Sequence, residues 1–422
     1  MTLQWSQDAY IIAFFLFCLS FILYVVTVAG RKMKTRDPVR FERRWGAISF
    51  GVTILGFISQ IVYFGCRWAY AGHIPVSNMY EFMSFLSMMI IGAFIVVYLI
   101  YRSTVLGLLA VPLAFLMMAY ASVFPSEVQP LIPQLNSVWL KLHVTMSALS
   151  YAFFAVAFVA GLLYLLRTVR WEEGSSRKPQ RWLEFTMGCI VVFIGFIVVV
   201  YSFRAANYEV VIGQKVETVK TGGEIETGLE MVTYTMPPLI APHMSDMSDE
   251  ATLKSVPSFL GMKLPLMEAP GWMKGVQAGR KLNTVVWSVI AGLILYGLIR
   301  LLLRKPIAKA LQPLFNGIDP ETVDEISYRS IAIGFPIFTL GALIFAMIWA
   351  QVAWSRFWGW DPKEVWALVT WLAYSAYLHL RLARSWQGTK SSWMSVIGFI
   401  IVMFTLVGVN LVISGLHSYS GV

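Results

Sequence analysis

Aromatic and charged side chains are concentrated between residues 354 and 366, which read WSRFWGWDPKEVW. This stretch lies between two long apolar runs, so we expect it just outside a bilayer. A belt of interfacial tryptophans needs only a few rings, which explains this density poorly. The rings instead predict a platform for a large, flat, apolar ligand, and they come from Trp354, Phe357, Trp358, Trp360 and Trp366.

Two of the five histidines are expected at the same depth as this platform. His143 lies at the outer mouth of the fifth apolar run, and His417 lies just past the outer end of the last one. A single interfacial histidine is usually only a polar side chain near the headgroups. Two of them beside an aromatic platform predict axial ligands for haem iron. Arg356 and Lys363 would then supply positive charge for the haem propionates.

A third histidine, His379, lies late in the ninth apolar run, within YSAYLHLRLAR. An ionisable group inside a span is a functional hypothesis by default. One interpretation is that His379 reaches toward the interface beside Arg381 and Arg384. The other is that it is one ligand of a second haem site. No other histidine is expected inside a span of this chain, so the second ligand would come from a partner subunit.

The sequence Asp361-Pro362 also predicts the start of a helix. Aspartate is favoured at the N-cap and proline at the first helical position. Glu364, three residues after Asp361, completes a pattern like a capping box. This local role accounts for the WDPKE core and leaves the upstream tryptophans unexplained.

The composition predicts an all-α polytopic membrane protein. Of the 422 residues, 58% are hydrophobic and 13% are charged, against about 25% charged residues in a typical soluble domain. Continuous apolar runs of bilayer length favour helices over a barrel. We expect about ten transmembrane helices, near 9–29, 46–66, 82–101, 104–121, 143–166, 184–203, 283–303, 330–351, 363–383 and 392–413.

Charge predicts the orientation of these spans. The net charge is +10, and the Lys and Arg residues cluster in short loops at 31–44, 167–181, 300–309 and 381–390. All four loops fall on one side of a ten-span topology, which the positive-inside rule makes cytoplasmic. Both termini and the tryptophan-rich loop are then extracytoplasmic. The basic charge is therefore assigned to membrane topology and not to nucleic-acid binding.

Three segments are expected along the chain. Residues 1–203 hold six spans, residues 204–282 form an extracytoplasmic loop segment, and residues 283–422 hold four spans and the tryptophan-rich loop at 349–366. The loop segment opens with YEVVIGQKVETV at 208–219, whose alternation predicts a strand. Its later prolines predict an extended linker. The three cysteines form no CxxC pair, which argues against a disulfide framework.

Several motifs together resemble a known family. WGWDPKEVWALVTW at 358–371, YLHLRLA at 377–383 and GVNLVISGLHSY at 408–419 are similar to the ResC/CcsA proteins of System II cytochrome c biogenesis. Those are haem-handling membrane proteins with a tryptophan-rich WWD loop. HIPVSNMYEF at 73–82 and LHVTMSALSYAFF at 142–154 also look like segments of that family. The loop departs from it at Ser355, where the family often has glycine, and 204–282 is longer than expected.

The resemblance implies roles for the residues that match. His143 and His417 would ligate haem b beside the WWD loop, at the outer face of a bacterial cytoplasmic (inner) membrane. His379 would hold haem on its way through the membrane, with its second ligand in a ResB/CcsB partner. Trp354, Arg356, Trp358, Trp360, Asp361 and Trp366 would surround the outer haem. Apocytochrome c and a thiol-reducing thioredoxin-like protein are the other implied partners.

The implied activity is presentation of haem, and export of haem across the membrane is a further expectation. Two thiols of a CxxCH segment add across the haem vinyl groups, so the chain would be a subunit of a holocytochrome c synthase. The sequence contains no dedicated acid–base or nucleophile constellation. Three alternatives stay open: a membrane transporter of another amphipathic solute, a haem-containing electron-transfer subunit, and a structural assembly factor without haem.

Overall fold

The structure is a computed structural model of the chain. It describes residues 1–30, 37–128, 130, 136–172, 174–219, 225–242, 259–261, 263–271 and 277–409. The chain forms two compact units, of which one contains Met1–Leu183 and Ala308–Leu406 and the other is centred on Glu184–Ile307. The first unit holds every described residue of the predicted haem site.

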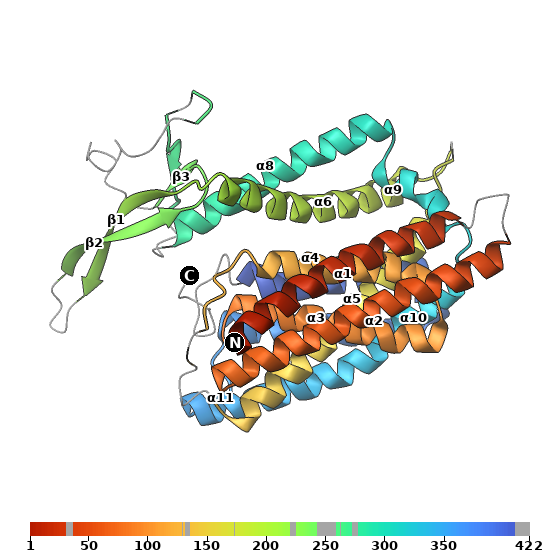
Figure 1. Cartoon of the computed structure of the whole chain (residues 1–422), viewed down its shortest axis with the longest axis horizontal. Coiled ribbons are helices and arrows are strands. Elements are labelled where there is room, and N and C mark those ends of the chain that lie inside the picture. Colours follow the sequence, from red (N-terminus) through yellow and green to blue (C-terminus); the bar gives the residue numbers. More distant parts are fainter. Residues whose placement is uncertain are drawn as a thin grey trace. The chain divides into compact units, whose positions relative to one another are not determined.

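The first unit is a bundle of long helices. Its N-terminal part contains α1 (Thr2–Gly30), α2 (Pro38–Ala71), α3 (Met79–Tyr101) and α4 (Thr104–Ala121). Its C-terminal part contains α9 (Ile307–Leu311), η2 (Gln312–Phe315), α10 (Pro320–Phe338), the π-helical segment η3 (Thr339–Phe345), α11 (Ala346–Trp354), α12 (Pro362–Arg381), η4 (Arg384–Trp386), α13 (Thr389–Met403) and the π-helical segment η5 (Phe404–Gly408). Figure 1 shows α1 and α2 running side by side as a hairpin.

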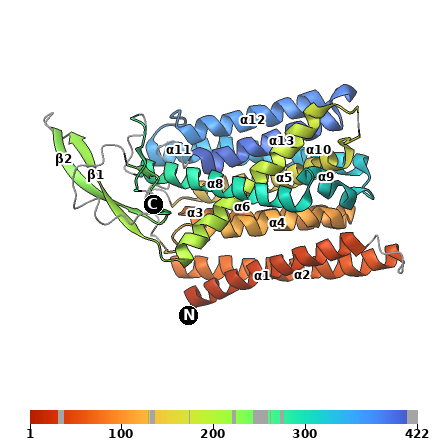
Figure 2. The same cartoon turned by 90° about the horizontal axis from the view of Figure 1, so that it is seen from above.

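Helix α5 (Val138–Thr168) is the central helix of this bundle. It packs against α3, α10 and α13, and Figure 2 shows it running beside α10. Small side chains allow such close approach, because membrane helices associate through packing and not through the hydrophobic effect. The buried small residues of α5 include Ala148, Ala152, Ala155, Ala157, Ala160 and Gly161. The core of the unit therefore lies along α5.

The prediction of an all-α polytopic membrane protein with about ten spans is confirmed. In the described ranges, nine helices are long and apolar enough to cross a membrane. The predicted span at 330–351 is a composite of α10, η3 and α11. The predicted span at 363–383 is α12, which has 20 residues. It is less apolar because it contains three charged residues, a histidine, two tryptophans and two tyrosines.

The second unit combines two long helices with short strands. Helix α6 (Arg177–Ala205) begins in the first unit and continues through the second, and α8 (Ala278–Leu303) follows the strands. The strand predicted at 208–219 is confirmed as β1 (Val210–Val219), which pairs antiparallel with β2 (Ile225–Tyr234). Two short strands, β3 (Ile240–Ala241) and β4 (Met267–Glu268), pair in parallel. Residues 220–224, which join β1 to β2, lie outside the described residues.

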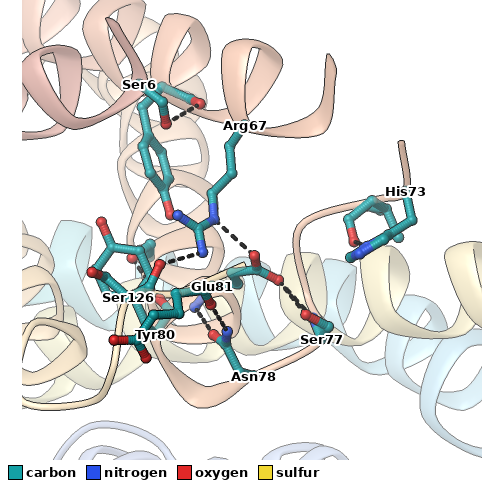
Figure 3. A network of polar contacts seen from close by, with 12 residues as sticks. Ser6, Arg67, His73, Ser77, Asn78, Tyr80, Glu81 and Ser126 are labelled. Carbon is teal, nitrogen blue, oxygen red and sulfur yellow. Dashed lines mark hydrogen bonds and ion pairs between the residues drawn. The ribbon is translucent and has the colours of Figure 1, made fainter. Parts of the chain in front are cut away.

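A buried polar network joins two loops of the first unit (Figure 3). Arg67 Nε lies 2.7 Å from Glu81 Oε1, and Arg67 Nη2 donates to Ser126 O at 2.8 Å. The second oxygen of Glu81 accepts from the Ser77 N–H and hydroxyl, both at 2.8 Å. Both charged side chains are almost fully buried, with 1% and 0% of their surface exposed. The network fastens the loop before α3 to the loop after α4.

Candidate functional site

The tryptophan-rich stretch folds as the end of one helix, a short irregular loop and the start of the next helix. Helix α11 ends at Trp354, and α12 begins at Pro362. The turn after α11 places Ser355 in the left-handed region, with φ of 56°. Glycine is the residue that adopts this region at least cost, which gives a physical reason for the glycine that the resembling family often carries there. Serine occupies the same turn in this chain.

The predicted N-cap of α12 is confirmed. Asp361 is buried, and its Oδ1 accepts from the Lys363 N–H at 3.0 Å. Glu364 Oε2 accepts from the N–H groups of Asp361, at 3.1 Å, and Gly359, at 2.8 Å. The capping box therefore extends back into the loop. It fixes the backbone of Gly359–Asp361 against the first turn of α12.

The aromatic side chains of the loop differ in exposure. Phe357 is 60% exposed and Trp360 is 70% exposed, while Trp358 is half-buried. Trp358 and Trp360 meet edge to face, with ring centroids 5.9 Å apart. The buried Nε1 of Trp358 has no acceptor among the residues that the structure describes. The loop thus presents large apolar faces, while the Trp358 donor is buried.

The two remaining tryptophans of the prediction are anchored on helices. Trp354, half-buried at the end of α11, packs edge to face on Trp349, with centroids 4.8 Å apart. Trp366, half-buried on α12, contacts Phe404, with centroids 4.3 Å apart. Arg356 is exposed, and its guanidinium lies over Gly359 so closely that a Cβ there would overlap it. The contact of Trp366 with Phe404 ties the start of α12 to η5, while Trp354 packs within α11.

His143 lies in the second turn of α5 and is held by the π-helical segment η3. Its Nδ1 lies 2.9 Å from Gly341 O. A backbone carbonyl only accepts, so Nδ1 carries the proton and Nε2 carries the in-plane lone pair. Metal-ligating histidines commonly donate their other N–H to such an acceptor, which fixes the tautomer and the ring orientation. The arrangement leaves Nε2 as the ring nitrogen with the lone pair that could coordinate a metal.

Trp349 connects His143 to the loop. Its ring is nearly parallel to the imidazole, with an angle of 10° and centroids 5.8 Å apart. Trp349 also contacts Trp354, so a row of rings runs from His143 to the end of α11. Sequence reasoning selected His143 and Trp354 but missed Trp349, because nothing in the apolar run distinguished it from an ordinary core tryptophan.

Gly341 is the second residue that sequence reasoning missed. A Cβ at this position would lie 2.6 Å from Met146 Cβ and 2.9 Å from Ser147 N. Only glycine therefore lets η3 approach α5 closely enough for its carbonyl to reach His143. A π-helical turn is a common local feature of functional sites. It depends on the packing of the helices and has no distinct pattern in this sequence.

His379 lies near the other end of α12 and is exposed. Arg381, two residues later, is buried and forms an ion pair with Asp324, with Nη1–Oδ2 at 2.7 Å. Of the two arginines that the interpretation places beside His379, Arg381 is therefore directed into the bundle, and Arg384 is exposed. His379 faces away from the bundle.

The other histidines lie elsewhere. His73 is buried in the loop before α3, with Nδ1 2.9 Å from Ile74 O. His243 and His417 lie outside the described residues, so the predicted pairing of His417 with His143 stays a prediction. In the described part of the chain, no group of three or more His, Cys, Asp or Glu side chains could hold a metal ion.

Comparison with known proteins identifies the family. The model of the cytochrome C assembly protein family matches residues 76–208 and 284–417. These ranges include His143, the tryptophan-rich loop and His379. The chain belongs to the cytochrome c assembly protein family.

Individual members of this family align along most of the chain. The cytochrome c biogenesis protein CcsA of Nostoc punctiforme is 31% identical over 362 residues, which cover 84% of this chain and 83% of that protein. The CcsA protein of Gloeothece citriformis is 31% identical over 363 residues. That of Picosynechococcus is 28% identical over 402 residues, covering 89% of this chain and 91% of that protein. The family membership supports a multi-pass membrane protein with a role in cytochrome c biogenesis.

Proposed function

We propose that this cytochrome c assembly protein binds haem beside the loop between α11 and α12 and presents it for attachment to apocytochrome c. The observation that carries the proposal is the contact between His143 Nδ1 and Gly341 O, 2.9 Å apart. It places the lone pair on Nε2 and orients the imidazole beside Trp349. A neutral imidazole in a fixed orientation is a suitable axial ligand for haem iron.

The residues of the loop between α11 and α12 also suit the rest of the haem molecule. Haem is flat and apolar with two propionates at one edge, so it needs aromatic faces and a few donors or cations. Phe357 and Trp360 offer exposed aromatic faces. Trp358 Nε1 is a donor, and Arg356 is an exposed cation at the same loop. We assign the second axial ligand to His417.

Attachment needs positioning more than acid–base chemistry. Each cysteine thiol adds across one vinyl group, forming one C–S bond and one C–H bond, with no net oxidation. Holding the vinyl edge near the two thiols can lower the barrier substantially. The capping box of Asp361 and Glu364 serves this task because it fixes the backbone that carries Trp358 and Trp360.

His379 would hold a second haem at the opposite end of α12. It is exposed on the bundle surface, so its haem would lie between this chain and another subunit. We infer a ResB/CcsB-like membrane partner that supplies the second ligand. A haem held there would be on a route toward the outer site, and a thiol-reducing thioredoxin-like protein would keep the apocytochrome cysteines reduced.

The outer site is tested by replacing its ligand in the complex with the ResB-like partner. We expect His143→Gly to lose most outer haem and to mature less than a tenth of the wild-type cytochrome c. Added imidazole should restore haem, because it can fill the space of the missing side chain. The measurements are absorption spectra of the purified complex and covalent haem on a reporter cytochrome c. His243→Ala is the matched control and should retain haem.

Three outcomes would overturn the proposal. Full haem content and full maturation in His143→Gly would remove His143 from the site. A folded wild-type complex with no haem would favour a transporter or an assembly factor. Haem that cycles electrons without supporting maturation would favour an electron-transfer subunit.

A further inference from the structure

A buried charge cluster lies where α10, α12 and α13 meet. Arg381, the last residue of α12, places Nη1 2.7 and 2.8 Å from the two carboxylate oxygens of Asp324 on α10. The same nitrogen donates to Ser391 Oγ at 2.8 Å, and Ser391 donates to Asp324 Oδ1 at 3.0 Å. Ser391 belongs to the first turn of α13. Each of the three helices therefore contributes one member.

The cluster is buried, and an aromatic ring lies against its guanidinium group. Asp324 is 9% exposed, Arg381 8% and Ser391 2%. The guanidinium also lies over the Tyr328 ring, with Cζ 5.2 Å from the centroid. Burying two charges is costly unless they are paired and hydrogen-bonded. Such a pair therefore strongly disfavours any rotation of α12 that would separate Arg381 from Asp324.

The position of Arg381 determines where His379 points. Two residues on an α-helix are separated by roughly 200° around the axis. Because Arg381 is directed into the bundle, His379 is directed to the opposite face, where it is exposed. The helix ends immediately after Arg381, so no further turn of α12 is available to hold this end. Arg381 is the charged residue of α12 that lies nearest to His379 in the sequence.

We infer that Arg381, with Asp324 and Ser391, is a positioning element for His379 as a haem ligand. The inference rests on the proposed function, in which His379 ligates a haem shared with a partner subunit. Arg381 does not touch the haem in this proposal. It fixes the rotation of the end of α12, so that the imidazole meets the partner's ligand across the haem.

The test uses the complex with the ResB-like partner and measures the coordination of its haem. A ferrous haem with two histidine ligands resists carbon monoxide because one ligand must first dissociate, whereas loss of one axial ligand leaves a site open for it. The neutral pair Arg381→Met/Asp324→Asn removes the cluster without leaving a buried charge unpaired. We expect it to raise the fraction of haem that binds carbon monoxide severalfold, close to the fraction in His379→Ala.

The triple variant separates positioning from a general structural role. If Arg381 acts through His379, adding Arg381→Met/Asp324→Asn to His379→Ala should change the carbon monoxide fraction no further.

Arg384→Met is the matched control, because Arg384 is an exposed arginine of the same region, and it should behave as wild type. Ser391→Ala keeps the ion pair and should give a smaller shift in the same direction. Ser391→Ala is the test of the positioning role if the variant Arg381→Met/Asp324→Asn does not fold.

The outcomes distinguish this inference from the proposed function. An unchanged spectrum in His379→Ala would overturn the role of His379 and the inference with it. An effect of His379→Ala together with wild-type behaviour of the neutral pair and of Ser391→Ala would overturn only the positioning role. A further rise in the carbon monoxide fraction of the triple variant above that of His379→Ala would also overturn the positioning role, because Arg381 would then act on the bundle independently of His379.

Discussion

At the scale of single residues, Gly341 decides how the imidazole of His143 is oriented. The carbonyl of Gly341 fixes the tautomer of His143, and the missing side chain allows η3 to pack directly on Met146 and Ser147. Trp371 Nε1 donates to Thr339 Oγ1 at 3.0 Å, which ties the same π-helical segment to α12. His143 and α12 are therefore linked through the π-helical segment η3.

Gly341→Ala should weaken haem binding and lower stability. The new Cβ would lie 2.6 Å from Met146 Cβ, so η3 must move away from α5 and the contact with His143 must lengthen. Overpacking of this kind costs about 1–3 kcal/mol. Haem content and thermal unfolding of the detergent-purified complex measure both effects. A variant with wild-type haem and unfolding temperature would contradict the tight approach.

Gly51→Ala is the control for this substitution. Gly51 lies in α2, and nothing lies within 4 Å of a Cβ built there. Alanine is the better helix former by roughly 1 kcal/mol. We therefore expect unchanged haem content and equal or slightly higher stability.

At the scale of elements, the first turn of α12 organises the tryptophan-rich loop. Glu364 accepts from two loop amides, and Asp361 caps the helix. The same sequence, Asp-Pro, begins α10, where Asp319 accepts from the N–H groups of Glu321 and Thr322. Only the cap of α12 is continuous with the loop that carries Trp358 and Trp360.

Glu364→Ala should loosen the loop, while Asp319→Ala should not. Loss of either cap costs about 1 kcal/mol, but only Glu364→Ala frees the amides of Gly359 and Asp361. We expect faster hydrogen exchange across 355–361 and a severalfold loss of haem in Glu364→Ala. Asp319→Ala should change exchange only near α10. Equal haem retention in both variants would show that loop order does not matter for binding.

At the scale of the whole molecule, buried ion pairs fasten segments that are distant in the sequence. Arg67 and Glu81 join the loop before α3 to Ser126 in the loop after α4. The pair between Arg381 and Asp324 does the same for α12 and α10. Removing one member of such a pair leaves a buried charge without compensation, which costs more than removing both.

Arg67→Met should destabilise the protein by about 3–5 kcal/mol, because Glu81 would remain buried without its partner. The double variant Arg67→Met/Glu81→Gln should be more stable than this single variant. The exposed pair of Arg329 and Glu325 is the control, and Glu325→Gln should cost less than about 1 kcal/mol. Thermal unfolding in detergent gives the comparison. A single variant as stable as the double would mean that Glu81 is solvated.

Local sequence patterns predicted several of the observed elements. The apolar runs predicted the spans, the alternation at 208–219 predicted β1, and Asp361, Pro362 and Glu364 predicted the cap of α12. The roles of Gly341 and Trp349 were not predictable. Their importance depends on which helix lies against α5, and neighbouring residues in the sequence do not contain that information.

The sequence by itself determined that the chain is a helical membrane protein, and it predicted where the chemistry is concentrated. Length and hydropathy decide whether a segment spans a bilayer, and residue type decides which side chains can ligate iron. Only the tertiary structure decided that His143 meets Gly341 O and that His379 faces outward while Arg381 faces inward. Those outcomes arise from helix rotation and packing, because a contact such as that of His143 with Gly341, 198 positions apart in the chain, forms only when the bundle assembles.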